Sequence, residues 1–363
     1  METRELLTLL TEIPAPTGRE EKRAAFVKKQ LESYGYSPVT DEAGNVVVER
    51  KVSLADEGFV LFTAHLDTVF PDTEIKVIAD EKGLHAPGIG DDTCNVVLLL
   101  KAMERLARCE LGTQVKNAIF AFDTGEEGLG NLKGIRQILK SYKGKIKACI
   151  AFDLTPEKLV VHHVGSRRFR VRIKTKGGHS LSDFGNTNAI AVAAKMIRKI
   201  YQIQVPSAFK TTYNVGTISG GTGINVIADE ADFTCEIRSE SREAMDTVEN
   251  QFMEIFEEGA ATDDVEVDVK LIGERPVGVE VDEKVKQELI RISQECIKES
   301  FLIEPELAFG STDCNAVEAE GIPAVSFGGY LGGGTHAKNE WITYDYENAG
   351  NKLFSEVLRK ILT

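Results

Sequence analysis

Three short segments in the first half of the chain are almost continuously apolar. They are residues 58–64 (GFVLFTA), 117–123 (NAIFAFD) and 147–153 (KACIAFD). Strands that are buried on both faces have this composition, and they occur in sheets that helices cover on both sides. Residues 23–35 (RAAFVKKQLESYG) precede them and end at a glycine, as a helix often does. The sequence therefore predicts an α/β fold.

The hydrophobic pattern changes near residue 166. Polar and apolar residues then alternate, as in antiparallel strands with one solvated face, and one helix-like run interrupts them. The alternating segments are residues 167–176, 211–220, 231–239 and 265–272, and the helix-like run is 188–200. We expect a smaller α+β domain, inserted at residues 166–274.

After this insertion the first pattern returns, with a long helix-like run at 281–300 and an apolar strand at 324–329. We expect residues 1–165 and 275–363 to form the first domain. A chain of 363 residues is long enough for two domains with a core each.

The charge balance restricts the class of partner. The formal net charge is −14 and the pI is about 5.1, so the chain would repel a phosphate backbone, and we expect no nucleic-acid partner. No apolar run approaches membrane-spanning length, and the six cysteines contain no CxxC pair. We expect a cytoplasmic protein that has no membrane partner and keeps most of its cysteines buried and reduced.

His65 and Asp67 directly follow the first apolar segment. A spacing of two residues places both side chains on one face of an extended chain. A histidine that binds a metal needs an acceptor for its second nitrogen, and Asp67 could supply one. The alternative is an ordinary histidine at the end of a strand.

Asp91 and Asp92 follow the glycine-rich turn APGIG and precede an apolar, helix-like run. Glycine lets the backbone approach a ligand closely. Two roles are open for the pair, metal binding and capping of the helix.

Glu126 and Glu127 stand side by side after the second apolar segment, and Asp153 ends the third. Adjacent carboxylates repel each other unless a cation stabilises their charged form. If one glutamate binds a metal, the other can act as a general base. His336, in the glycine-rich segment GGYLGGGTHAKNEWI, is a further candidate ligand. The alternative for the pair is an exposed acidic loop.

The charges of these candidates suit two metal ions. Asp91, Glu127 and Asp153 carry three negative charges, which two divalent cations and one bridging hydroxide would neutralise. His65 and His336 would add one neutral ligand each. We interpret His85, His162 and His163 as ordinary polar or core histidines.

Taken in order, HLD, PGIGDD, GEEG, AFD and a late, glycine-flanked TH resemble the motifs of the co-catalytic zinc peptidases typified by peptidase T, carboxypeptidase G and aminoacylase. The resemblance covers nearly the whole chain. It implies a catalytic domain with a mixed central sheet flanked by helices, and an inserted α+β domain that serves as a lid and a dimerisation element.

The resemblance also implies a ligand set for two ions, most often Zn²⁺, with Co²⁺ or Mn²⁺ as substitutes. One metal would be held by His65 and Asp153 and the other by Glu127 and His336, with Asp91 bridging them.

Three further roles follow from the same resemblance. Asp67 would orient the His65 ring. Glu126 would take a proton from the water that bridges the metals and pass it to the leaving amine. His179, in KGGHS, would polarise the scissile carbonyl, often from a partner subunit, in which case the protein is a homodimer.

The resemblance places Asn225 and Arg238 near the substrate, where the arginine would bind a free carboxylate. An exposed strand arginine in a surface ion pair is the alternative for Arg238. Gly310 and Ser311, with Asp313, would shape the pocket or merely form a turn and a helix cap. Gly125 and Thr93 depart from the pattern, since relatives often have aspartate and lysine there, and this leaves the subfamily and substrate open.

The resulting expectation is a metal-dependent hydrolase that cleaves amide bonds of small peptides, as a di- or tripeptide aminopeptidase similar to peptidase T. An N-acyl amino acid deacylase or a carboxypeptidase on the same scaffold is the alternative. A nucleotide-binding protein is disfavoured, because GGTG and GGYLGGG lack the lysine and hydroxyl residue of a phosphate loop.

Overall fold

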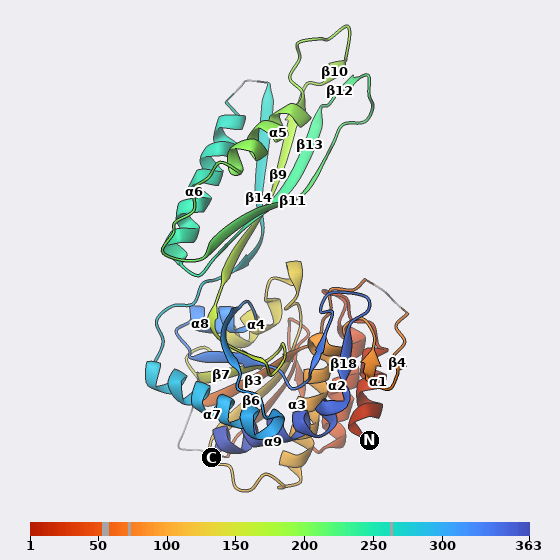
Figure 1. Ribbon diagram of the computed structural model, residues 1–363, viewed down its shortest axis with the longest axis vertical. Helices are drawn as coiled ribbons and strands as arrows, with labels where there is room; N and C mark the ends of the chain where they lie inside the picture. Colours follow the sequence, from red (N-terminus) through yellow and green to blue (C-terminus); the bar gives the residue numbers. More distant parts are fainter. Residues whose placement is uncertain (53–57, 72–73, 262–263) are drawn as a thin grey trace. The chain divides into compact units, whose positions relative to one another are not determined.

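The computed structural model describes residues 1–52, 58–71, 74–261 and 264–363 (Figure 1). The chain divides into two compact units. The first consists of Met1–His163 and Gly278–Thr363, and the second of Val164–Val277. These limits lie near residues 166 and 274, where the sequence pattern changes.

An eight-stranded sheet with the order β1-β2-β6-β3-β7-β16-β8-β15 forms the centre of the first unit. The strands β6, β3, β7 and β16 run parallel, whereas β2 pairs with β6 in the antiparallel sense. The bounds are β1 (Val39–Thr40), β2 (Val46–Arg50), β3 (Phe59–His65), β6 (Asn117–Asp123), β7 (Ile146–Phe152), β8 (Lys158–His163), β15 (Glu306–Gly310) and β16 (Ala324–Phe327). The predicted α/β fold with a mixed central sheet is confirmed.

Helices cover both faces of this sheet. Alternate residues of β3 point to opposite faces, so that Phe62 packs in a core with α3 and α9, and Leu61 packs in a second core with α4 and α8. The first unit contains α1 (Thr3–Thr11), α2 (Glu21–Ser33), α3 (Asn95–Ala107), α4 (Lys133–Ser141), α7 (Glu283–Phe301), α8 (Cys314–Ala319) and α9 (Ala349–Leu362).

A small antiparallel sheet of the first unit joins distant parts of the chain. Its order is β17-β18-β5-β4, with β4 (Ile78–Ala79), β5 (Gly83–His85), β17 (Gly332–Gly333) and β18 (Trp341–Thr343). The turns η1 (Ile89–Cys94), η2 (Gly128–Gly130) and η3 (Tyr344–Glu347) complete the unit. Pairing of β18 with β5 holds the segment that carries His336 beside the one that leads to Asp91.

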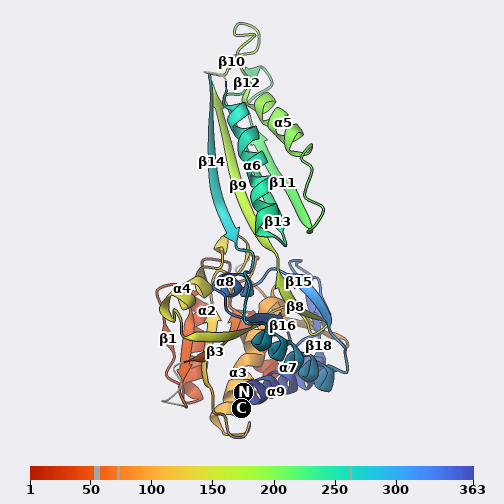
Figure 2. The ribbon, with the colours of Figure 1, turned by 90° about the vertical axis from the view of Figure 1, so that its left-hand side faces the viewer.

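The second unit is a four-stranded antiparallel sheet, β11-β13-β9-β14, with α5 and α6 packed on one face (Figure 2). Residues along β13 alternate between buried and partly exposed positions, as the sequence pattern predicts. The bounds are β9 (Gly165–Thr175), β10 (Gly178–His179), α5 (Ala189–Ile200), β11 (Thr211–Gly220), β12 (Val226–Ile227), β13 (Glu230–Ser239), α6 (Arg242–Gly259) and β14 (Val265–Arg275).

The six cysteines, all within the described residues, are free thiols, and only Cys109 is exposed. Among the described helices, none is long and apolar enough to cross a membrane.

Candidate metal centre

The carboxyl ends of three parallel strands bring the candidate ligands together. His65 is the last residue of β3, Asp153 directly follows β7, and Glu126 and Glu127 lie in the turn after β6. Because β3 pairs in parallel with both β6 and β7, these segments leave the sheet at the same edge. Open α/β sheets place their ligands at this edge.

Asp91 lies between two histidines from distant parts of the chain. Its Oδ1 is 3.0 Å from Nε2 of His65, and its Oδ2 is 3.3 Å from Nε2 of His336. The Asp91 side chain is buried. Each carboxylate oxygen therefore faces a different imidazole, as in a carboxylate that is shared between two adjacent metal positions.

Three overlapping groups of side chains could hold a metal ion. In each group one ligand atom from every residue lies within 4.8 Å of the others. The groups are His65 with Asp92 and Asp153, His65 with Glu126 and Glu127, and Asp91 with Glu127 and His336. The third group includes a contact of 2.8 Å between Glu127 Oε1 and Nε2 of His336.

The electrostatics of the cluster favour a bound cation. Burial and the nearby charge of Asp91 raise the pKa of Asp153 well above its usual value, and burial also raises the pKa of Glu127. Burial alone would raise the pKa of Asp91 as well, but hydrogen bonds with His336 and His65 lower it. Buried carboxylates that repel one another are stabilised by divalent cations. Carboxylate and imidazole ligands suit zinc, so the residues present fit the two predicted metals.

Asp67 contacts the histidine differently from the sequence expectation. Nδ1 of His65 bonds to the backbone oxygen of Asp67 at 3.0 Å, whereas the Asp67 carboxylate is 3.6 Å from that nitrogen. The carboxylate instead accepts the backbone N–H groups of Glu126 and Glu127, each at 3.0 Å, and the Thr17 hydroxyl at 2.9 Å. Asp67 therefore holds the histidine with its main chain and the two glutamates with its side chain.

Asp92 also acts on the backbone. Its Oδ2 accepts the N–H of His65 at 2.9 Å, and its Oδ1 accepts from the Asn95 side chain at 2.7 Å. The residue at the N-cap of α3 is Cys94 rather than Asp92. Asp92 thus ties the end of β3 to the segment that carries Asp91.

Glu340 is a buried residue of the site that the sequence interpretation missed. Its carboxylate accepts the N–H groups of Gly88, Gly90 and Asp91 at 2.7, 3.0 and 2.8 Å. Burial raises the pKa of Glu340 to about 7. A Cβ at position 90 would lie 2.7 Å from the Glu340 carboxylate, which explains the glycine there. The sequence feature that could have identified Glu340 is its position, four residues after His336 in the same glycine-rich segment.

Arg23, on α2, was also missed, because nothing in its sequence context distinguishes it from the neighbouring surface charges. It is completely buried and donates to the Leu66 carbonyl at 2.9 Å and to Thr93 Oγ1 at 3.1 Å. Burial lowers its pKa to about 10, and the charges of Asp67 and Asp92 oppose this shift. Its guanidinium group therefore holds the backbone of Leu66, which lies between His65 and Asp67, and the side chain of Thr93.

The other histidines have ordinary partners. His85 pairs with Asp80 at 3.0 Å, His163 is buried against Glu318 at 2.6 Å, and His162 stacks on Phe309. At the end of β15, a Cβ at Gly310 would lie 2.8 Å from the Val160 side chain, so a close packing contact requires this glycine. The next residue, Ser311, is partly buried.

Asp313 is buried at the start of α8 and makes no capping hydrogen bond there. Instead, Oγ1 of Thr312 accepts the N–H of Cys314 at 3.3 Å. The contact at the start of α8 is therefore made by Thr312, the residue before Asp313.

His179 and Asn225 lie together in the second unit. Ser180 donates its N–H to the Asn225 carbonyl at 3.0 Å, and both side chains are exposed. Nδ1 of His179 accepts the N–H groups of Leu181 and Ser182 at 3.2 and 3.4 Å. The ring proton is therefore on Nε2, which is available to donate.

Arg238 lies at the other end of the same unit. It is near the end of β13, eight residues after Glu230, which is a separation of about 26 Å at the usual rise of a strand. The segment of His179 is anchored near the beginning of β13, because Thr175 donates its N–H to the Asp229 carbonyl. Arg238 donates to Glu236 at 3.0 Å, so the ion pair that the sequence left as an alternative is present.

Comparisons with known proteins identify the family of the chain. The model of the peptidase family M20/M25/M40 matches residues 61–360. Aminopeptidase PepT from Bacillus cereus ATCC 10987 is 22% identical with a TM-score of 0.76, and the match covers 100% of this chain and 98% of that one. A tripeptidase (SAV1512) from Staphylococcus aureus Mu50 is 22% identical with a TM-score of 0.80, covering 99% and 98%.

A third similar structure is the YXEP protein of Bacillus subtilis, described as a dinuclear metal-binding peptidase from the M20 family. It is 18% identical with a TM-score of 0.67, and the match covers 99% of this chain and 97% of that one. The matched range, residues 61–360, is most of the sequence, and all the candidate metal ligands lie within it. The chain therefore belongs to the peptidase family M20/M25/M40 and is a metal-dependent peptidase.

Proposed function

We propose that this peptidase is a two-metal aminopeptidase that removes the N-terminal residue from di- and tripeptides. The observation that carries the proposal is the Asp91 carboxylate, which directs one oxygen to His65 and the other to His336. Glu126 and Glu127 complete the same cluster. The reaction class follows from the family, and the substrate class is supported by the aminopeptidase and the tripeptidase among the similar structures.

In the proposed assignment, one metal is held by His65 and Asp153, the other by Glu127 and His336, and Asp91 bridges them. Zinc is the proposed native metal, because two imidazoles and three carboxylates are typical zinc ligands. When bound, the metals would polarise the substrate carbonyl and lower the pKa of water.

Glu126 is the proposed general base. Its side chain is buried, and its backbone N–H is fixed by the Asp67 carboxylate at 3.0 Å. It would accept a proton from the attacking water and deliver that proton to the nitrogen of the leaving amine. The adjacent Glu127 contacts His336, which suits its proposed role as a metal ligand beside the general base.

The second unit is proposed to bind substrate as a lid. Arg238 would pair with the free carboxylate of the peptide, and Nε2 of His179 would donate to the oxygen on which negative charge develops. Asn225 lies beside His179, and Gly310 and Ser311 are proposed to border the pocket.

The separation of Arg238 from the segment of His179 along β13 has a consequence for the oligomeric state. Arg238 is about 26 Å along β13 from Glu230, and the segment of His179 is tied to the beginning of that strand, so we infer that a small peptide does not reach both residues within a single chain. We propose a homodimer in which His179 and Asn225 serve the site of the partner subunit. The free thiols suit a reducing compartment, and we propose the cytoplasm.

The test is a matched panel of substrates with zinc-loaded enzyme: free dipeptides, free tripeptides, and their N-acetylated and C-terminally amidated forms. We expect cleavage of free peptides with release of the N-terminal residue. Turnover of the acetylated compounds would make the protein a deacylase, and release of C-terminal residues would make it a carboxypeptidase. Loss of activity on amidation alone would support the carboxylate contact of Arg238.

A further inference from the structure

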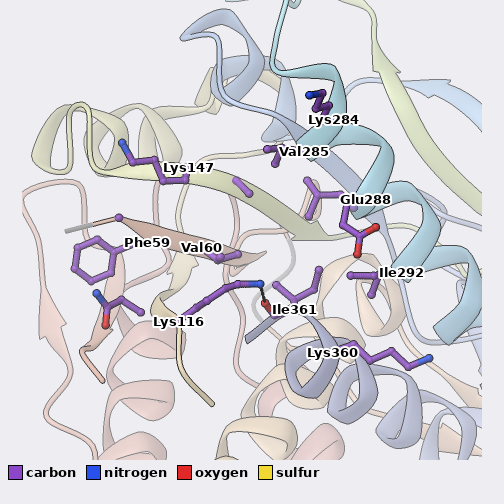
Figure 3. Close-up of a pocket in the computed structure, with 14 residues that line it drawn as sticks. Phe59, Val60, Lys116, Lys147, Lys284, Val285, Glu288, Ile292, Lys360 and Ile361 are labelled. Atoms are coloured by element: carbon purple, nitrogen blue, oxygen red, sulfur yellow. Dashed lines mark hydrogen bonds between the residues drawn. The ribbon is translucent and has the colours of Figure 1, made fainter. Parts of the chain in front are cut away.

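A cavity of about 490 Å³ lies in the first unit, at the amino ends of the parallel strands (Figure 3). Phe59 and Val60 begin β3, and residues from α7 and from the end of α9 form the opposite wall. The metal cluster lies at the carboxyl end of the same strand. The seven residues of β3 separate the two places by about 20 Å.

The inner surface of this cavity is aliphatic. Val60, Leu289, Ile292 and Ile361 line it, and each of them is almost fully buried. The volume is within the range of about 300–1,000 Å³ that is usual for sites that bind small molecules. An apolar group would therefore be shielded from water in this cavity.

Lysines surround the aliphatic surface. Figure 3 shows Lys116 extending among the apolar side chains and Lys147 and Lys284 at their margin, while the ammonium group of Lys360 points away and pairs with Glu299 at 3.1 Å. These lysines gather at one cavity although the chain as a whole has a net charge of −14.

The ammonium groups near the cavity are poorly neutralised. Lys116 donates to the Ile361 carbonyl at 3.0 Å, and Lys147 donates to the Gly144 carbonyl at 3.2 Å. The backbone N–H of Lys284 donates to Asp282 at 3.0 Å, whereas its ammonium group has no hydrogen bond or ion pair with any residue of the described part of the chain.

Glu288 is the one carboxylate among the described residues that line the cavity. It pairs with Arg291 at 2.7 Å. The cavity thus combines an aliphatic interior with an excess of positive charge.

We propose that this cavity binds a fatty acid, with the hydrocarbon chain against the aliphatic side chains and the carboxylate at the rim, in the positive field of Lys147 and Lys284. An aliphatic carboxylate satisfies both parts of the site, because burial of its chain is favourable and its head group pairs with the lysines. This site is separate from the metal centre, so the bound acid is not the substrate of the peptidase.

The test is a calorimetric titration of the metal-loaded protein with decanoate. We expect saturable binding with one site per chain, and weaker binding of decan-1-ol, which has the same chain without the charge. Lys147→Glu and Lys284→Glu should each weaken decanoate binding about tenfold or more, the scale of one charge-assisted hydrogen bond. Lys22→Glu, an exposed lysine on α2, is the matched control and should leave binding unchanged.

A second variant tests the apolar part without changing any charge. Val285 lines the cavity and is 37% exposed, so Val285→Trp should be tolerated by the fold and should abolish binding by filling the space. All four variants should retain peptidase activity, which shows that they are folded.

Three results would overturn the proposal. They are the absence of decanoate binding to the unchanged protein, equal affinity for decan-1-ol, and full decanoate affinity in the two charge-reversal variants. Tighter binding of D-leucyl-D-leucine than of decanoate would instead identify the ligand as the carboxyl end of a peptide and would overturn the assignment to a fatty acid.

Discussion

The two edges of the central sheet are built from the same strands but carry opposite chemistry. At the carboxyl edge, His65, Asp153 and the turn after β6 form a buried, acidic cluster. At the amino edge, Phe59 and Val60 of the same strand β3 line an aliphatic cavity bordered by lysines. The interior of the strands is apolar throughout, so the residues just beyond the strand ends decide which chemistry each edge supports.

The largest loss of catalytic activity is expected on replacement of Glu126, at the carboxyl edge. We expect Glu126→Gln to lower kcat about a thousandfold, within the usual range for loss of a general base. The metal content should stay the same, because Glu126 is not a proposed ligand. Steady-state kinetics and elemental analysis of the same sample would check both points, and kcat within tenfold of the unchanged enzyme would contradict the role.

Removal of the metals should lower the stability of the protein, because the metals are proposed to bind the carboxylates at the carboxyl edge. Chelation exposes the mutual repulsion of the buried carboxylates and removes the stabilisation by binding, which is about 4 kcal/mol when the free metal is a thousand times its Kd. Calorimetry of the chelated and zinc-loaded forms should show a lower unfolding temperature without metal. Asp91→Asn should reduce this difference, and an undiminished difference would argue against a bridging Asp91.

A smaller effect is expected at Glu340, which acts through the backbone of the Asp91 turn. Glu340→Gln keeps the shape but weakens its contacts with three N–H groups. We expect metal affinity to fall about tenfold to a hundredfold, as for other residues that position ligands. Excess zinc should restore activity in this variant but not in Glu126→Gln. Failure of rescue with normal metal content would assign Glu340 a different role.

The smallest effect on catalysis is expected at the amino edge. Lys147→Glu and Lys284→Glu reverse charges at a distance of about 20 Å from the metal cluster, where salt screens them strongly. We expect kcat/KM for a tripeptide to remain within about twofold. A large change in kcat/KM would show that the two edges are coupled, and it would break the separation drawn between them.

Much of the fold was accessible from sequence because its signals are local. The apolar segments predicted strands buried on both faces, and the polar residues directly after them predicted where ligands gather, as His65 and Asp153 illustrate. Parallel pairing then brings those strand ends to one edge without further information.

Contacts between distant backbone segments could not be predicted in this way. Glu340 and Arg23 act on N–H and carbonyl groups of other segments, and nothing in the local pattern identifies such partners. The spacing of His65 and Asp67 predicted that the Asp67 carboxylate supports the His65 ring, but it did not reveal that the main chain of Asp67 makes the bond. The separation of Arg238 from His179 depends on how β9, β10 and β13 are paired.

The position of Glu340 also has a consequence for how the enzyme is made. Its carboxylate accepts the N–H of Asp91, and His336, four residues earlier, is a proposed ligand, so one late segment contributes two residues to the candidate site. On the ribosome, His65 through Asp153 emerge first, and the whole second unit follows before His336 appears. The candidate site therefore stays incomplete until nearly the whole chain has been synthesised, and we expect tight metal binding only after the segment of His336 has joined the catalytic unit.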